Sequence, residues 1–446
     1  MTVSEIRENA IEGVGGYLAE LERFQPEGQP AWVQALRRVA AERFATLGFP
    51  SLRQEEWRLT NISPVAKGTF HRPESDPDAL DPVQITPFDF EAAARLVFVD
   101  GRFSSRLSSA EGLPQGTVVT SLAEALLRMP EKVEPWLGQL AKLDHSFVAL
   151  NTAFLRDGAF VWVPRDAVVG PVHLLFYSSS AEDGRATVSF PRNLIVTGES
   201  SQLSIVETYI GHGEYFNCPV TELAAGANSS VDHYKVQRES RDAYHLATFQ
   251  LLGDRACAPS SHSISIGGSL VRNDVNAVLD GEGIDCILNG LYLADGRQLV
   301  DNHMRVEHAK PHCASHELYK GVLDGKARAV FNGLIHVHPG AQKTDAKQSN
   351  RNLLLSKDAI ANSNPQLEIY ADDVKCTHGS TVGQLDDDAI FYLRSRGIGA
   401  EAARSLLTYA FASDIVERIK VEPVRRDLEE LLFARLPQGD VVRQAV

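Results

Sequence analysis

The spacing of apolar residues changes twice along this chain and divides it into three regions. In the first region, apolar residues recur every three or four positions over 6–21 and again over 33–47. This period is that of an amphipathic helix. Gly48, followed closely by Pro50, then ends the second helix. The chain therefore begins, on its pattern alone, with two helices.

The pattern is mixed between these helices and residue 151. Several prolines over 71–90 predict a linker. Residues 96–101 predict a strand and a turn, and 122–129 predict a helix. We therefore predict a helical and mixed α/β region over 1–150.

Helical periodicity disappears from about residue 151, and short β-rich runs alternate with Gly, Asn, Asp and Ser. Glycine turns recur at Gly198, Gly226, Gly253 and Gly281, in steps of 28, 27 and 28 residues. A repeat of this length without a helix favours a β-solenoid, in which each turn stacks on its neighbours. A β-sandwich with chance spacing is the alternative. We predict a mainly β chain with a solenoid core over 151–383.

The last region, 384–446, returns to helical spacing. Asp386 and the two aspartates after it are placed to cap a helix over 389–396, because carboxylates there meet free amides and the helix dipole. Further helices are predicted over 402–416 and 424–436. The apolar face of such a helix usually packs on a core. A helical region at the end of a solenoid also has a side that is free to bind a partner.

Composition narrows the class of function. A formal net charge of −14 over 446 residues argues against nucleic acid as a partner. No run approaches the roughly 18 apolar residues of a membrane span, and the polar start contains no apolar signal core. We expect a cytoplasmic protein that contacts no membrane. The five cysteines, widely spaced and without a CxxC pair, indicate reduced thiols. They are Cys218, Cys257, Cys286, Cys313 and Cys376.

The run from Pro365 to Gly379 places a thiol and an imidazole two residues apart. Cys376 and His378 share one face of a strand, because residues i and i+2 point the same way. The alternation of apolar and polar residues changes phase at Asp372-Asp373, which predicts a corner there. Iron or zinc is the kind of metal that such a pair holds. Simple packing is the alternative.

Histidines supply a second set of candidate ligands, since ten of the fourteen lie between His233 and His378. His308, His312 and His316 would form one face of a helix, but Pro311 disfavours a helix there. His336 and His338 share one face of a strand. The chain contains no GxSxG, no P-loop and no HExxH motif, so it should not hydrolyse ATP. A metal-dependent β-helix enzyme, either a hydrolase or a polysaccharide lyase, remains an alternative.

Several phrases in one order resemble the core of the SufB/SufD family, whose members are scaffold subunits of the SUF iron–sulfur cluster assembly system. The phrases are Glu307–Cys313, Tyr319–Asp324, Ala329–Gly333, Ala341–Ala346, Asn350–Ser356 and Pro365–Gly383. The likeness extends more loosely to Arg53–Arg58 and to the C-terminal helices, and it is weakest over 75–150.

The resemblance implies a right-handed parallel β-helix between two helical regions. It also implies a non-catalytic scaffold that pairs with a SufB-like subunit and a SufC-like ABC-type ATPase and carries a transient iron–sulfur cluster. Cys376 and His378 match the family's Cys-x-His, with the histidine near the SufB interface. SufB-type chains have a Glu-rich phrase here, so the match favours the SufD type.

The same resemblance places the ATPase on the C-terminal helices, around residues 390–420. Our candidate contacts there are Tyr392, Arg396, Tyr409 and Phe411. A homodimer of the isolated chain is a further expectation, and an adaptor in which Cys376 and His378 only pack is a third hypothesis.

Overall fold

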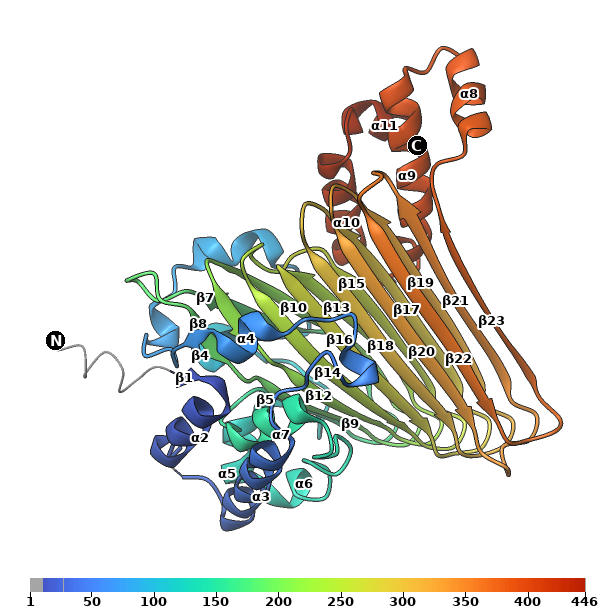
Figure 1. The fold of residues 1–446 in the computed structure, drawn as a ribbon. Coiled ribbons are helices and arrows are strands. Elements are labelled where there is room, and N and C mark those ends of the chain that lie inside the picture. Colours follow the sequence, from blue (N-terminus) through green and yellow to red (C-terminus); the bar gives the residue numbers. More distant parts are fainter. Residues whose placement is uncertain (1–10, 27, 446) are drawn as a thin grey trace.

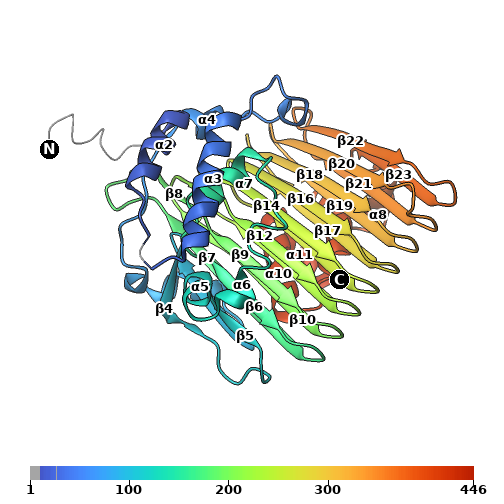
Figure 2. The same cartoon turned by 90° about the horizontal axis from the view of Figure 1, so that it is seen from below.

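The computed structural model describes residues 11–26 and 28–445, so the apolar positions predicted before residue 11 lie outside it. Two long sheets face each other and form a parallel β-solenoid, because successive strands alternate between them (Figures 1 and 2). The predicted mainly β class and solenoid core are confirmed. None of the described helices is long and apolar enough to cross a membrane.

The strands have these bounds. In spatial order, the first sheet contains β4 (Arg102–Ser109), β3 (Ala94–Val99), β7 (Val168–Ser179), β10 (Gln202–His212), β13 (Ser230–Arg238), β15 (Ala258–Ser265), β17 (Asp285–Ala294), β19 (Ala314–Leu323), β21 (Asp345–Leu354) and β23 (Lys375–Gly383). The second contains β5 (Val118–Ser121), β6 (Ala159–Val163), β9 (Arg192–Thr197), β12 (Val220–Ala225), β14 (Tyr244–Gly253), β16 (Leu270–Leu279), β18 (Leu299–His308), β20 (Arg328–Val337) and β22 (Ile360–Ile369). Shorter strands are β1 (Ile11–Glu12), β2 (Thr69–Phe70), β8 (Thr187–Ser189) and β11 (Tyr215–Asn217).

The register between turns reproduces the repeat seen in the sequence. Gln202 lies beside Ser230, 28 residues later. Gly198 and Gly226 occupy matching corners, where a Cβ on Gly226 would lie 2.4 Å from the carbonyl oxygen of Thr197. The glycines recur because two backbones approach too closely for a side chain. Gly253 departs from this pattern, since it pairs with Ala225 rather than with Gly226.

A ladder of left-handed residues runs along the same edge. Their φ values lie between 55° and 75°, and each N–H donates to a carbonyl oxygen of the following turn, as from Ser200 to Ala227 at 2.8 Å. These hydrogen bonds hold a conformation that non-glycine residues otherwise avoid. The residues after Asp166 in this ladder are Ser200, Asn228, Ala256, Gly283, His312 and Lys343.

Helices cover one end and one face of the solenoid. The N-terminal set packs over the first turns, and α9 and α10 pack on the outer face of the first sheet. Asp386 accepts the N–H of Asp388 at 2.9 Å, which confirms the predicted cap. The bounds are α2 (Gly13–Arg23), α3 (Ala31–Leu47), α4 (Ser63–Lys67), α5 (Leu122–Arg128), α6 (Pro130–Val133), α7 (Ser146–Ala153), α8 (Asp387–Ser395), α9 (Ala400–Val416), α10 (Glu422–Arg435) and α11 (Gly439–Ala445).

The proline-rich segment 71–90 is a structured connection rather than a free linker. It forms short 3₁₀ helices, and its Ile85 is buried against Val97 and Tyr177 of the first sheet. Those helices are η2 (Pro77–Ala79), η3 (Pro82–Gln84) and η4 (Thr86–Phe88), and η1 (Glu55–Trp57) precedes them. Proline sets a backbone angle that suits the start of such turns.

A buried ion pair joins the second sheet to the N-terminal helical region. Arg192 and Glu222 approach to 2.7 Å, and both are almost fully buried. Glu222 also accepts the N–H groups of Leu140 and Ala141 at 3.1 and 2.9 Å. One carboxylate therefore connects two parts of the chain.

We expect Glu222→Ala to lower the free energy of unfolding by about 3–5 kcal/mol, because it leaves Arg192 charged and unpaired in the interior. Urea denaturation followed by circular dichroism measures this change. Glu199 is the matched control, since its pair with Arg165 is exposed, and Glu199→Ala should cost about 0.5 kcal/mol or less. Equal losses in the two variants would contradict the assignment.

Candidate functional site

The last turn of the solenoid is open. β22 and β23 are the terminal strands of their sheets and pair on one side only, with β20 and β21. In Figure 1 no described element lies beyond them, because the C-terminal helices pack on the outer face instead. This end presents two unpaired strand edges and the interior of the last turn.

The predicted corner at Asp372-Asp373 is present between β22 and β23. The N–H of Lys343 donates to the carbonyl oxygen of Asp373 at 2.6 Å, which continues the left-handed ladder. Leu367, before the corner, and Cys376, after it, pack in the same small apolar cluster. The change of phase at this corner therefore keeps the apolar side chains of both strands facing inward, as the sequence indicated.

Cys376 is half-buried at this end. It lies against Ala346 and other apolar residues of the last turns. Burial raises the pKa of its thiol, and the nearby Asp345 carboxylate raises it further, against the lowering effect of the Ala346 N–H. The thiol is therefore protonated at neutral pH, and a metal must displace that proton to bind.

His378 is exposed and lies beside Gln348 in the register. Strand alternation places its side chain on the same inward face as Cys376. Within the described ranges, no group of three or more His, Cys, Asp or Glu residues is arranged to hold a metal ion. Cys376 and His378 thus offer two ligands, and a metal centre with the usual four would need others from outside the chain.

A polar column continues inward from His378, and sequence reasoning missed it. Gln348 donates from Nε2 to Oε2 of Glu317 at 2.9 Å. Gln348 also crosses the lumen to Gly333, where a Cβ would lie 2.3 Å from its amide nitrogen. Burial raises the pKa of Glu317 to about 7. The signal in the sequence was the repeat itself, since 317, 348 and 378 are one turn apart.

The histidines at 308, 312 and 316 do not converge. His308 is buried, with Nε2 2.8 Å from Oγ of Ser315, whereas His312 is an exposed corner residue in the ladder. His316 alternates with the buried Ser315 and Glu317 and so lies on the outer face. The metal-enzyme alternative therefore finds no ligand set in this segment.

His336 and His338 also lie on the outer face, away from Cys376. Their ring centroids are 4.7 Å apart. Each faces a carboxylate: His336 Nδ1 lies 2.8 Å from Glu368, and His338 Nε2 lies 3.5 Å from Glu307. These contacts account for the HxH pattern as surface ion pairing.

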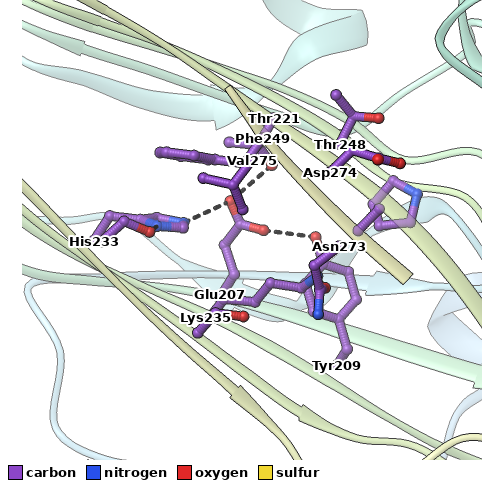
Figure 3. A pocket seen from close by; sticks show the side chains of 14 residues that line it. Glu207, Tyr209, Thr221, His233, Lys235, Thr248, Phe249, Asn273, Asp274 and Val275 are labelled. Carbon is purple, nitrogen blue, oxygen red and sulfur yellow. Dashed lines mark hydrogen bonds and ion pairs between the residues drawn. The ribbon is translucent and has the colours of Figure 1, made fainter. Parts of the chain in front are cut away.

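A second polar cluster lies deeper in the solenoid (Figure 3). Glu207 accepts from Thr221 at 2.8 Å and from Tyr209 at 2.6 Å, and it lies 3.2 Å from His233. Burial lowers the pKa of Lys235 to about 8, and its Nζ donates to Asn273 at 2.7 Å. The adjoining cavity of about 20 Å³ is too small for an organic ligand. This network stabilises the interior.

The four candidate ATPase contacts fall into two groups. Tyr392 is exposed on α8, with the Arg396 guanidinium 4.8 Å from its ring. Tyr409 instead stacks on Phe433 with ring centroids 4.7 Å apart. Phe411 accepts from Lys320 through its carbonyl oxygen at 3.0 Å. Tyr409 and Phe411 therefore help to fix the helices, whereas Tyr392 and Arg396 face solvent.

We expect Glu317→Gln to stabilise the protein at high pH. The folded state raises the pKa of Glu317 to about 7, above the roughly 4.3 of an unfolded chain. The stability from its proton is complete below the unfolded value and is lost progressively as pH rises from there through 7, by roughly 4 kcal/mol. Glutamine cannot lose a proton, so the variant should exceed wild type in denaturation midpoint above pH 7.

The difference in denaturation midpoint between Glu317→Gln and wild type should shrink as pH falls from 7 towards 5. Urea midpoints between pH 5 and 8 test this, with the exposed Glu182→Gln as control. A constant difference between Glu317→Gln and wild type across this pH range would refute the assignment.

Known proteins match this chain over most of its length. A model of the "SUF system FeS cluster assembly, SufBD core domain" matches residues 176–411, and one of the "SufBD protein N-terminal region" matches 18–172. An iron–sulfur cluster assembly SufBD family protein of Synechocystis is 34% identical over 412 residues, covering 90% of each chain. The iron–sulfur cluster assembly protein SufD of Escherichia coli is 30% identical and covers 93% of this chain and 96% of its own.

The SufD protein of Bacillus subtilis is 28% identical and covers 91% of this chain and 94% of its own. The match spans both the N-terminal region and the solenoid core that carries Cys376 and His378. The chain therefore belongs to the SufBD family of the SUF iron–sulfur cluster assembly system.

Proposed function

We propose that this chain is a SufD-type, non-catalytic scaffold that builds and transfers nascent iron–sulfur clusters with a SufB-like subunit and a SufC-like ATPase. The observation that carries the proposal is the position of Cys376 and His378 on the inward face of the last strand, at an open solenoid end. The thiol of Cys376 is a soft ligand and the imidazole of His378 is a borderline one. Both lie where a second protein can reach them.

The open end is the proposed binding surface for the SufB-like subunit. Unpaired edges of β22 and β23 are templates for further strand pairing. Large apolar side chains lie exposed at or beside this end, namely Ile360, Ile369, Tyr370 and Val382. A solenoid end without a polar capping element exposes apolar surface, and a bound partner would remove that surface from water. In isolation, a second copy of this chain would use the same surface.

The cluster is the cargo of this site and is shared with the partner. His378 binds metal as the neutral imidazole. Cys376 becomes a ligand only when a metal or a cation on the partner lowers its pKa, because burial alone keeps the thiol protonated. Cys376 needs reducing conditions to remain a free thiol, and the five unpaired thiols fit the cytoplasm.

The ATPase is proposed to bind α8. That helix buries none of its residues, and Phe391 and Tyr392 are 71% and 56% exposed. Aromatic residues and arginine dominate interface energies. Tyr392 and Arg396 are therefore the direct contacts, and Tyr409 and Phe411 position the helices behind them. Phe391 is an additional contact that sequence reasoning did not single out.

We expect His378→Ala to lose cluster binding while keeping its partners. The tagged chain is expressed with SufB-like and SufC-like subunits and purified without oxygen, and bound subunits and iron–sulfur absorbance are measured. Loss of one ligand should lower metal affinity by about tenfold or more. Cys376→Ser should retain the complex and show a smaller or equal loss.

His312→Ala is the matched control, because His312 is an exposed histidine at a corner away from the open end. A His378→Ala complex with a full cluster would favour the adaptor hypothesis. A lone protein with stoichiometric zinc would favour the metal enzyme.

We expect Tyr392→Ala to weaken ATPase capture by about 2 kcal/mol, the typical loss at an interface hot spot. The affinity of the purified ATPase for the immobilised chain measures it. Leu127→Ala, at an exposed apolar residue on α5, should leave that affinity unchanged. Unchanged ATPase binding in Tyr392→Ala would move the interface away from α8.

A further inference from the structure

A cluster of arginines lies at the end of the molecule opposite to β22 and β23. Arg72, Arg102 and Arg156 line a pocket of about 40 Å³, together with aromatic residues and one carboxylate, that of Asp100. The elements that form it, around α2, β4 and β8, lie far from β23 in Figure 1. Three cationic groups around one small cavity stand out in a chain of net charge −14.

A tight hairpin fixes Arg102 at this pocket. Asp100 and Gly101 have φ values of 51° and 76°, and Val99 pairs with Arg102 across the turn. This is the two-residue turn that matches the twist of the strands. Gly101 packs closely on the neighbouring strand, since a Cβ there would lie 3.0 Å from Cβ of Ser189. Arg102 therefore has little freedom to move away.

The guanidinium of Arg102 forms no direct ion pair with any of the described residues. Its Nε and Nη2 atoms are buried and have no hydrogen-bond partner in the part of the chain that the structure describes. Burial lowers the pKa of Arg102, and the positive charge of Arg156 lowers it further, whereas the carboxylates of Asp100 and Asp76 act in the opposite direction. Buried donors without acceptors are costly, as are like charges held together. Such donors in a native fold call for an explanation, and a bound ion is one.

Two carboxylates, those of Asp100 and Asp76, attract Arg102 electrostatically, but neither forms an ion pair with it. Asp100 accepts the N–H of Ser179 at 2.8 Å and forms no ion pair with Arg102. Arg156 forms no hydrogen bond or ion pair with the described residues. Arg72 differs, because Glu20 neutralises it and its guanidinium lies 5.1 Å from the ring of Phe24. Among the described residues, Arg102 and Arg156 are thus the two arginines of the pocket that form no ion pair.

We propose that this pocket binds a small oxyanion of the phosphate or sulfate type between Arg102 and Arg156, with Arg72 at its rim. Guanidinium groups match the geometry of such anions through paired N–H donors. The exposed Arg156 provides the side from which the ion enters. The ion is either free or the terminal group of a phosphate ester, and the chemistry of recognition is the same. The site does not rest on Cys376 and His378.

The test is thermal unfolding of the full chain in inorganic phosphate against chloride at equal ionic strength, with calorimetric titration of phosphate. Wild type should show a Tm that rises and saturates with phosphate. Arg102→Gln and Arg156→Gln should bind phosphate about tenfold more weakly or worse, as expected for loss of a charge-assisted hydrogen bond. Arg128→Gln, at an exposed arginine paired with Glu124, should match wild type.

No phosphate-specific rise in wild type, or the same rise in all four proteins, would overturn the proposal. If Arg102→Gln does not fold, Arg156→Gln carries the test, because its side chain is exposed. Titration with glycerol phosphate separates the two sources. Tighter binding than inorganic phosphate supports an ester as ligand, and weaker binding supports the free ion.

Discussion

Backbone hydrogen bonding between successive turns is the constraint on which the rest of this structure depends. Every strand from β10 to β21 is paired on both sides with strands of the turns before and after it, and the register shifts once between Leu203 and Ile205 of β10. The corner ladder adds one more bond per turn, such as that from Asn228 to the carbonyl oxygen of Arg255 at 2.9 Å. Because the register is fixed, residues about 30 apart in the sequence lie next to each other on adjacent strands. Their side chains form columns along the solenoid.

The same constraint explains why the candidate site lies at an end. The backbone hydrogen bonds of a strand are formed on both sides only where another turn follows. No described turn follows β22 and β23. The C-terminal helices do not cover this edge, because their apolar residues pack on the outward side chains of β13, β15, β17 and β19. Cys376 and His378 therefore lie where the lumen of the solenoid opens to solvent.

Polar groups inside the solenoid are arranged by the same columns. Glu317 and Gln348 meet because they are register partners on adjacent strands. Glu207 reaches His233 diagonally, because its own register partner is Lys235, two residues further along the strand. Burial in an interior of low dielectric shifts the proton affinity of these groups, and neighbouring donors decide the direction. In this respect the lumen beneath His378 differs from a hydrocarbon core. It holds a carboxyl group, Glu317, that exchanges a proton near neutral pH.

Features that depend on local periodicity could be predicted from the amino-acid pattern alone. The change from helical to strand spacing, the repeat of 27 or 28 residues, the corner at Asp372-Asp373 and the shared face of Cys376 and His378 all follow from side-chain alternation within one segment. The likeness to a known family assigned the chain to iron–sulfur cluster assembly on phrases within that same core.

Contacts between residues far apart in the sequence became visible only in the folded chain. The tertiary structure spread His308, His312 and His316 over the lumen, a corner and the outer face, because the chain turns between them. It used Tyr409 and Phe411 for packing and left Tyr392 exposed, because only one side of the helices fits the sheet. It also joined Arg102 to Arg156 across two unrelated segments. No short-range pattern encodes such contacts, since they depend on register between turns and on how helices dock.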